Sequence, residues 1–146
     1  FGLREAHVDT ALETLKHGHV LIVFPEGEDG NFKPSSERYQ LQKFHSGFLR
    51  LAREAKVPII PCVVVGSEDS FLNLGKIDLG RYVSKLKLPI PLNLVPLPAR
   101  WRIRFLPAVQ AKNKAGQGTV RRKMQLALRA ELRARRYVYF NPETRA

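Results

Sequence analysis

Apolar residues recur at helical spacing in three parts of the chain. Residues 6–17 and 46–55 each place four apolar side chains on one face, and Gly18 is a typical stop after the first. Residues 119–137 carry the longest such pattern. Its apolar stripe consists of Val120, Met124, Ala127, Leu128 and Leu132. The sequence therefore predicts three helices over these ranges.

Three apolar runs have the composition of strands instead. Residues 20–24 (VLIVF) and 58–65 (PIIPCVVV) are continuous β-branched and apolar runs, which are typical of buried strands. The two prolines of the second run belong near its start or at an edge, because proline cannot donate to a ladder. Residues 101–105 alternate with Arg102 and Arg104, which predicts a strand with one basic face.

The segments between these elements are polar or rich in proline. Residues 25–36 are rich in Pro, Gly, Asn, Asp and Ser and predict a loop, residues 71–82 are mixed, and residues 86–98 hold four prolines and are irregular or extended. The order of helices and strands favours an α/β layered fold with a partly parallel sheet. Ligands of such sheets bind where loops leave the carboxyl ends of strands, so the loop after residues 20–24 is the first candidate site.

The charge of the chain predicts an anionic partner. The 146 residues are one domain's length, and with 44% hydrophobic and 26% charged residues they can form a packed core. Lys and Arg number 25 against 13 Asp and Glu, a net charge of +12. Residues 100–136 hold 12 of these cations and one acid, Glu131, so the rest of the chain is nearly neutral. Nucleic acid, an acidic membrane surface or a phosphorylated substrate fits this surplus.

Several kinds of site are excluded or not expected. Cys62 is the single cysteine, so an internal disulfide and a multi-cysteine zinc site are excluded, and its apolar run predicts a buried, inert thiol. No metal site is predicted, because the acidic residues match no calcium loop. No apolar run is long enough to cross a bilayer and no signal peptide is visible. The start at Phe1 rather than Met favours a fragment or a processed piece.

Three short motifs resemble those of one enzyme family. Residues 23–27 (VFPEG) resemble the "FPEG" box of the glycerophospholipid acyltransferases, and residues 57–63 (VPIIPCV), about thirty positions later, resemble that family's "VPIVPV" box. Residues 47–52 resemble the helix between the two boxes. The resemblance covers residues 6–65. It implies a three-layer α/β/α acyltransferase fold, with a mostly parallel or mixed central sheet, that works at a membrane surface.

The two outer boxes are the substrate-binding residues that the resemblance implies. They are Phe24, Pro25, Glu26 and Gly27 in the first box and Val57, Pro58, Ile59 and Pro61 in the second. In the family the first box is associated with the glycerol and phosphate of the acceptor. Physically, Pro25 stiffens the strand exit, Gly27 permits a backbone conformation that a side chain would forbid, and Glu26 can bind a glycerol hydroxyl or brace neighbouring backbone amides. A plain turn after a strand is the alternative.

The catalytic box of the family, a His followed five residues later by an Asp, is absent. The histidines are His7, His17, His19 and His45, and the residues five positions on are Leu12, Ile22, Phe24 and Arg50. In the family this His is the general base on the acceptor hydroxyl. We therefore expect no catalytic residue in this chain. Residues 1–146 are then the C-terminal portion of a single acyltransferase domain, inactive alone, and an inactive homologue is the alternative.

A second departure concerns the phosphate of the acceptor. The family continues its first box with Thr, Arg and Ser, whereas this chain has Glu28, Asp29 and Gly30. Carboxylates in place of that Arg repel a phosphate. Either another cation supplies the contact, or the acceptor carries no phosphate there. The nearest cations are Lys33, Arg38 and Lys43.

The basic helix and the proline-rich segment each have two interpretations. The cations around the apolar stripe of residues 119–137 include Arg121, Arg122, Lys123, Arg129 and Arg133. They form either a solvated face or a membrane surface for anionic headgroups, at about 1 kcal/mol for each cation. The proline-broken residues 86–98 are either a core connection or a loop that dips into the interface.

Together these observations predict an acyltransferase that moves a fatty acyl group from acyl-CoA or acyl-carrier protein to a hydroxyl of a lysophospholipid or related glycerolipid. No cofactor beyond the co-substrate is expected, and the protein is expected to be peripheral, on the cytoplasmic face of a membrane. A basic nucleic-acid-binding domain is one alternative, although the chain lacks basic strands interleaved with aromatic residues. A non-catalytic lipid-binding module with the same fold is the other.

Overall fold

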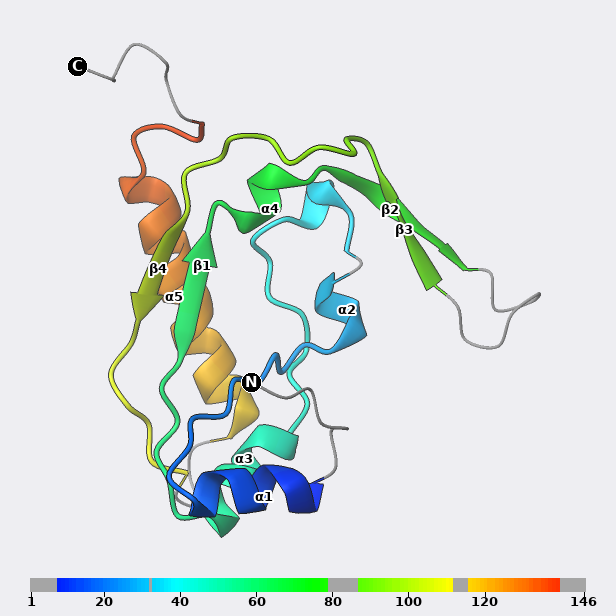
Figure 1. The fold of residues 1–146 in the computed structure, drawn as a ribbon. Coiled ribbons are helices and arrows are strands. Elements are labelled where there is room, and N and C mark those ends of the chain that lie inside the picture. Colours follow the sequence, from blue (N-terminus) through cyan, green and yellow to red (C-terminus); the bar gives the residue numbers. More distant parts are fainter. Residues whose placement is uncertain (1–7, 32, 79–86, 112–115, 140–146) are drawn as a thin grey trace.

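The computed structural model describes residues 8–31, 33–78, 87–111 and 116–139 (Figure 1). The helices are α1 (Val8–Lys16), α2 (Glu28–Asn31), α3 (Gly47–Glu54), α4 (Ser67–Ser70) and α5 (Gln117–Ala134), with the 3-10 helix η1 (Ser35–Glu37). The strands are β1 (Cys62–Val65), β2 (Asn73–Asp78), β3 (Lys87–Pro91) and β4 (Arg102–Phe105). The predicted helices are confirmed within a few residues at each end as α1, α3 and α5, although residues 6 and 7 lie outside the described residues.

The described strands form two small sheets. β1 pairs with β4 and β2 pairs with β3, both antiparallel. The expectation of a mostly parallel sheet is therefore wrong. The described residues form a mixed α/β structure, and the three-layer α/β/α fold is not confirmed. A parallel pair needs a long crossover, usually a helix over the sheet. Here β1 and β4 are joined through the β2–β3 hairpin, which projects from the body of the molecule (Figure 1).

The prediction of a buried strand at residues 20–24 is also wrong. This segment has no regular secondary structure, and Val20 and Phe24 are 88% and 79% exposed. Its composition is that of a strand, but burial also needs a covering surface. No strand among the described residues pairs with it.

The core lies between α5 and β1. Tyr39, Val63, Val65 and Leu128 form a buried cluster. The rest of the predicted stripe of α5 packs against this cluster or, in the case of Val120, is itself buried. α1 packs against α3 at the other end of the molecule. The helical pattern of residues 119–137 therefore predicted the core-facing side of α5 correctly.

β4 has the predicted alternation, and its basic face lies on the side of α5, although all four residues of the strand are exposed. Arg104 lies opposite the buried Val63 in the sheet, so the two side chains share the face that α5 covers. The Arg104 Nη1 atom lies 2.6 Å from Oε1 of Glu131 on α5. Ile103 and Phe105 are exposed on the other face, and Cys62, opposite Phe105, is half-buried rather than buried.

The proline-rich segments are more ordered than expected. The predicted loop 25–36 contains α2 and the start of η1, and the mixed segment 71–82 supplies β2. β3 occupies the first part of residues 86–98, and the rest is irregular, as predicted. The two prolines of the run 58–65 precede β1, which agrees with the expectation. No described helix combines the length and apolar character needed to span a membrane.

Candidate functional site

The first box forms a tight turn. The Gly27 amide donates to the Phe24 carbonyl at 3.2 Å, and Gly27 has φ +60°, which disfavours a side chain. The Pro25 carbonyl accepts a hydrogen bond from the His45 amide at 2.8 Å. The turn is therefore fixed to a segment that follows it by about twenty residues.

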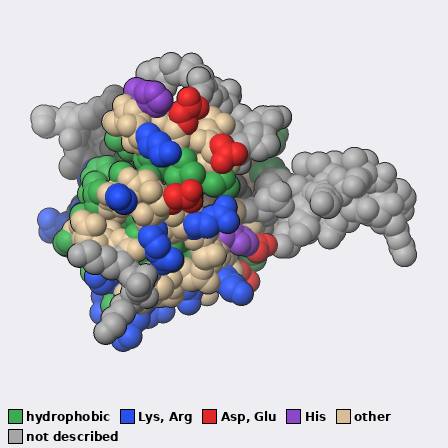
Figure 2. All heavy atoms as spheres, turned by 90° about the horizontal axis from the view of Figure 1, so that it is seen from below, with side chains coloured by type: hydrophobic (Ala, Val, Ile, Leu, Met, Phe, Trp, Pro, Cys, Tyr) green, Lys and Arg blue, Asp and Glu red, His purple; other side chains and the backbone are tan. Residues whose placement is uncertain are grey.

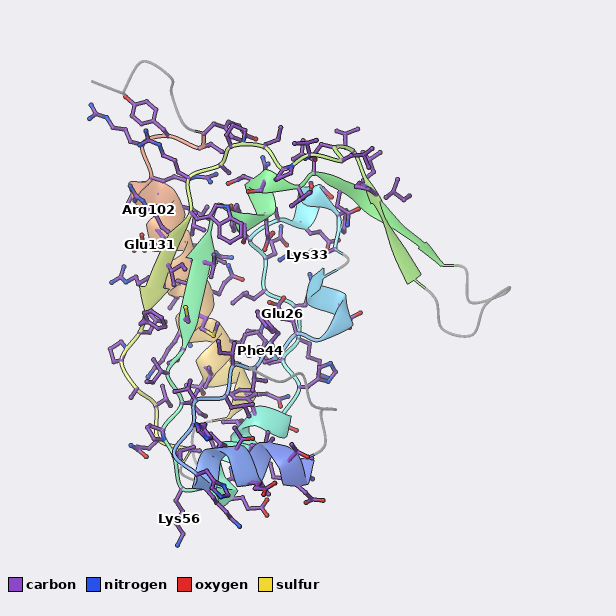
Figure 3. The ribbon with its side chains drawn as sticks, in the orientation of Figure 1. Glu26, Lys33, Phe44, Lys56, Arg102 and Glu131 are labelled. Atoms are coloured by element: carbon purple, nitrogen blue, oxygen red, sulfur yellow. The ribbon has the colours of Figure 1, made fainter. Side chains whose placement is uncertain are left out.

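Glu26 makes the second link to this segment. Its side chain is half-buried, and Oε2 accepts a hydrogen bond from the Gln42 amide at 2.6 Å. Among the described residues no hydrogen bond to Oε1 is formed. Gly30 lies so close that a Cβ atom there would be 2.7 Å from Cβ of Glu26. Glu26 thus braces a backbone amide and keeps one carboxylate oxygen for another partner. Figure 3 shows Glu26 and Phe44 in the central part of the molecule.

The strap, defined as residues 39–45, is held in turn by α5. Gln125 accepts from the Leu41 amide at 2.8 Å and donates to the Tyr39 carbonyl at 2.9 Å, so its side chain amide bridges both ends of a short stretch. Arg121 Nη1 donates to the Leu41 carbonyl at 2.6 Å. The chain of contacts from α5 through the strap to Glu26 fixes the geometry of the first box.

Tyr39 anchors the beginning of the strap in the core. Its hydroxyl donates to Asp69 Oδ2 at 2.6 Å and accepts from the Gly66 amide at 2.8 Å. Burial and the hydrogen bond to Asp69 raise the pKa of Tyr39 to about 12. Arg135 pairs with the same carboxylate, and its guanidinium carbon lies 5.5 Å from the centre of the Tyr39 ring. Asp69 is thus a buried charge with a cationic and a phenolic partner.

Gly66 lies at the point where the chain leaves β1. It has φ +106°, and a Cβ atom there would be 2.2 Å from the Arg100 carbonyl oxygen. The backbone before β4 therefore passes directly over this residue, next to the Tyr39 hydroxyl.

The three candidate phosphate contacts differ in their surroundings. The side chain of Lys33 is only 7% exposed, and it pairs with Glu68 Oε1 at 2.9 Å, which leaves it little freedom to reach a ligand. Arg38 is partly exposed and lies 3.5 Å from Asp69. Lys43 is exposed in the strap and has no partner among the described residues. Lys43 is therefore the cation best placed for an anionic acceptor.

The second box makes its backbone hydrogen bonds to segments other than the first box. The Val57 amide donates to the Ala52 carbonyl at 3.0 Å, and Ile59 exchanges two backbone hydrogen bonds with Val109. The buried Pro61 accepts from the Leu106 amide at 2.8 Å, and Pro58 is exposed. No hydrogen bond links residues 57–61 to residues 24–27 in the part of the chain that the structure describes. The second box supports the strand β1 and its approach to β4.

The cations predicted for a membrane surface are all exposed. They are Arg121, Arg122, Lys123, Arg129 and Arg133, around the buried stripe of α5. Arg121 also holds the strap. Figure 2, which views the molecule from below, shows Lys and Arg side chains spread over that face, most of them toward the left and the bottom, and acids at the centre and toward the right.

Sequence reasoning missed Gln42, Gln125, Tyr39 and Asp69. Tyr39 and Asp69 lie thirty positions apart, and no local spacing rule joins them. Gln125 stands beside Met124 in the helical pattern and looks like an ordinary surface residue. An aromatic residue in the polar stretch before the second helix was the one available signal, since tyrosine is a frequent core residue with a polar tip.

Comparisons with known proteins agree with the motifs. Residues 2–65 match the family model described as Acyltransferase. Two relatives, named Uncharacterized protein Rv0502 of Mycobacterium tuberculosis and Uncharacterized protein Mb0514 of Mycobacterium bovis, are 40% identical over 101 residues. Uncharacterized protein ML2427 of Mycobacterium leprae is 39% identical over the same length.

The match covers 62% of this chain and 28% of each of these relatives, so the chain spans less than a third of their length. No solved structure matches this chain. The resemblance to acyltransferases that the motifs indicated is therefore confirmed over residues 2–65, the part of the chain that matches the family model.

Proposed function

We propose that this chain is part of an acyltransferase that moves a fatty acyl group from acyl-CoA or acyl-carrier protein to a hydroxyl of a lysophospholipid or related glycerolipid. Residues 1–146 are then the C-terminal portion of one acyltransferase domain. A His outside this chain removes the proton of the acceptor hydroxyl, and the oxygen attacks the thioester carbonyl. The new ester C–O bond forms, the C–S bond breaks, and the thiol leaves with a proton.

The braced turn of the first box is the observation that supports this proposal most directly. The carbonyl of Pro25 and the carboxylate of Glu26 are each held by an amide of the strap, so the turn is rigid before a substrate arrives. Oxygen Oε1 of Glu26 is then positioned to accept a hydrogen bond from a glycerol hydroxyl. Such pre-organisation lowers the entropy cost of holding the acceptor.

The charges around the turn limit which acceptor headgroups can bind there. Lys33 is neutralised by Glu68, and Asp29 is an exposed carboxylate close to the turn. An acceptor without a phosphate at this point meets no repulsion there. An acceptor with a phosphate is held by Lys43, an exposed residue that follows Gln42, whose amide binds Glu26.

The protein works as a peripheral protein on the cytoplasmic face of a membrane in this proposal. The exposed cations of α5 attract anionic lipid headgroups, and the same charge suits the phosphates of coenzyme A or an acidic carrier protein. Neither co-substrate needs a further cofactor, and nucleic acid is not an expected partner.

Acyl transfer is tested on the longer natural protein that contains this chain and on the 146-residue chain alone. The acceptors are lysophosphatidic acid, lysophosphatidylglycerol and monoacylglycerol, the donor is acyl-CoA, and thiol release and lipid chromatography are the readouts. We expect transfer by the longer protein and none by the 146-residue chain. Equal rates for both contradict the assignment of the base to a region outside this chain.

The role of Glu26 is tested in the longer protein with Glu26→Ala and Glu26→Gln. Loss of a hydrogen bond to a charged group costs on the order of 1.5–3 kcal/mol, so Glu26→Ala lowers kcat/KM at least about tenfold. Glu26→Gln keeps an oxygen that can accept from the Gln42 amide but removes the negative charge. Comparing the two variants therefore separates the effect of the hydrogen bond to the strap from the effect of the charge. Glu54→Gln is the matched control, because it neutralises an exposed carboxylate at the end of α3, outside the turn. Full activity of both Glu26 variants contradicts the proposed site.

A further inference from the structure

An exposed apolar rim lies along one edge of the molecule. We define the rim as Phe71, Leu74, Leu92, Leu94 and Val95, which are all exposed, with Leu94 and Val95 at 90% and 75%. The segment from β3 to β4 crosses this edge next to α4 and β2 (Figure 1). Figure 3 shows side chains projecting outward along the same edge. Monomeric proteins seldom expose so many large apolar side chains together unless they bind a partner there.

The backbone of the rim is bonded internally through Asn93. Its Oδ1 accepts from the Leu72 amide at 2.7 Å, and its Nδ2 donates to the carbonyls of Ser70 and Val95 at 3.0 and 2.6 Å. The Leu92 amide donates to the Leu72 carbonyl at 2.8 Å, which fixes the two parts of the rim side by side.

The remainder of the loop follows the same pattern. The Leu97 amide donates to the Ser70 carbonyl at 2.8 Å, and Pro96 and Pro98 have no amide hydrogen to satisfy. The apolar side chains of this loop are exposed, whereas its backbone amides and carbonyls are hydrogen-bonded within the protein. This arrangement suits an environment with little water, such as the lipid interface. An ordinary solvent-exposed loop has no need of this arrangement.

Aromatic and cationic side chains flank the rim. Trp101 is 57% exposed, and its Nε1 donates to Ser70 Oγ at 2.9 Å, which places the indole beside the rim. The Arg136 guanidinium carbon lies 6.0 Å from the centre of the exposed Tyr137 ring, and the Arg100 amide binds the Val138 carbonyl at 2.9 Å. Trp and Tyr are enriched at the headgroup level of membranes, where Arg meets lipid phosphates.

The acids next to the rim do not cancel this positive charge. Glu68 is paired with Lys33, and the buried Asp69 is paired with Arg135. Both lie in α4, directly before Phe71. The exposed Arg136, beside Tyr137 and near the end of the segment that forms the rim, therefore faces solvent, and its charge fits an anionic surface.

We propose that the rim inserts into the headgroup region of an anionic lipid bilayer, with Arg136 on the headgroups and Trp101 at the boundary. The rim thereby orients the protein at the membrane. The proposal rests on the proposed acyltransferase function for its purpose, which is to bring the first box to acceptor lipids, but lipid binding itself is measured without catalysis.

Trp101 is the single tryptophan of the chain, so it reports the insertion directly. The full chain is mixed with vesicles of phosphatidylcholine, with and without phosphatidylglycerol, and with a brominated acyl-chain lipid. We expect a blue shift of the emission on anionic vesicles and quenching by the bromines. Binding to neutral vesicles is expected to be at least about tenfold weaker, and salt weakens binding to anionic vesicles. Binding to anionic vesicles without a Trp101 response overturns the proposal.

The double variant Leu94→Asp, Val95→Asp is expected to bind anionic vesicles at least about tenfold more weakly than the unmodified chain. The double variant Val20→Asp, Ile22→Asp is the control, because it adds the same charge at two exposed apolar residues of the segment before the first box. Circular dichroism checks the fold of each variant, and exposed positions are expected to tolerate the change. Unchanged binding by the double variant overturns the proposal, as does a rim that instead binds mixed DNA and RNA or a second copy of the chain.

Catalysis in the longer natural protein separates this proposal from the proposed function. With a short-chain lysophospholipid dissolved in water, the double variant is expected to retain its rate, because no membrane is needed. With the acceptor in vesicles its rate falls. Equal rates on vesicles for variant and unmodified protein overturn the role of the rim alone, whereas no acyl transfer to any acceptor contradicts the proposed function alone.

Discussion

The hydroxyl of Tyr39 joins the strap to the core, and Tyr39→Phe removes it while keeping the ring. The hydroxyl donates to the buried Asp69 carboxylate at 2.6 Å and accepts from the buried Gly66 amide at 2.8 Å. The ring itself packs with Val63, Val65 and Leu128, and phenylalanine fills the same space. The substitution therefore isolates two hydrogen bonds from the packing.

The expected loss of stability follows from these two bonds. A hydrogen bond to a charged group contributes about 1.5–3 kcal/mol, and a buried amide left without a partner costs about 1–3 kcal/mol. Asp69 keeps its ion pair with Arg135, so the loss of the hydrogen bond to its carboxylate is expected to lie at the lower end of its range. We expect Tyr39→Phe to lower the free energy of unfolding by about 3 kcal/mol, which corresponds to a Tm about 6–12 °C lower.

Urea unfolding followed by circular dichroism measures this difference. Tyr137→Phe is the matched control, because it removes the hydroxyl of an exposed tyrosine and is expected to change the free energy of unfolding by less than about 0.5 kcal/mol. If Tyr39→Phe is as stable as the control, Tyr39 does not anchor the strap and the reasoning from the buried hydrogen bonds fails.

The pH dependence gives a second measurement of the same contact. The pKa of Tyr39 is about 12 in the folded chain against an ordinary value of 10.0, because burial and Asp69 disfavour the phenolate. The contribution to stability is therefore complete below pH 10 and is lost as the pH rises through 12. It amounts to about 2–3 kcal/mol. The stability gap between the unmodified chain and Tyr39→Phe is expected to narrow over this range, and a constant gap contradicts the assignment.

Three further changes test other contacts. Gly30→Ala places a methyl group against Glu26 and is expected to lower the free energy of unfolding in urea by about 1–3 kcal/mol. At Gly47 the added methyl meets open space, so Gly47→Ala is expected to change it by less than about 1 kcal/mol, and equal effects contradict the steric reasoning. Burial raises the pKa of Cys62, so its alkylation at neutral pH is expected to be slower in the folded chain than in urea, and equal rates contradict this. Ile22→Lys charges an exposed apolar run and is expected to raise solubility without lowering Tm, as light scattering and a melting curve show; unchanged aggregation contradicts this.

Local patterns in the sequence predicted the helices and the side of α5 that is buried. The stripe from Val120 to Leu132 repeats over several turns, and such a signal survives any tertiary context that offers one apolar surface. The alternation in β4 was equally readable, but which face turns to α5 was not. In β4 Arg104 pairs with Glu131 of α5, and Ile103 is exposed on the opposite face. This is the reverse of the simple expectation that apolar residues face the core.

Contacts between distant residues were beyond sequence reasoning. The composition of residues 20–24 matches a buried strand, yet burial depends on a partner that no local pattern specifies. Lys33 looked like a solvated loop charge or a phosphate contact, and its burial against Glu68 depends on how α4 meets the segment before η1. For the candidate site, the motif located the turn at Glu26, but its partner Gln42 follows from the path of the strap.

The exit of β1 has one further consequence. The Arg100 carbonyl oxygen would stand 2.2 Å from any Cβ atom at Gly66, closer than two unbonded atoms can approach. These two backbone segments can therefore lie this close together because Gly66 has no side chain. Even an alanine there must displace the segment that leads into β4, which contains Trp101 and is bonded to the Val138 carbonyl through the Arg100 amide. A single methyl group at position 66 would therefore disturb the Tyr39 anchor and the edge that bears the tryptophan at the same time.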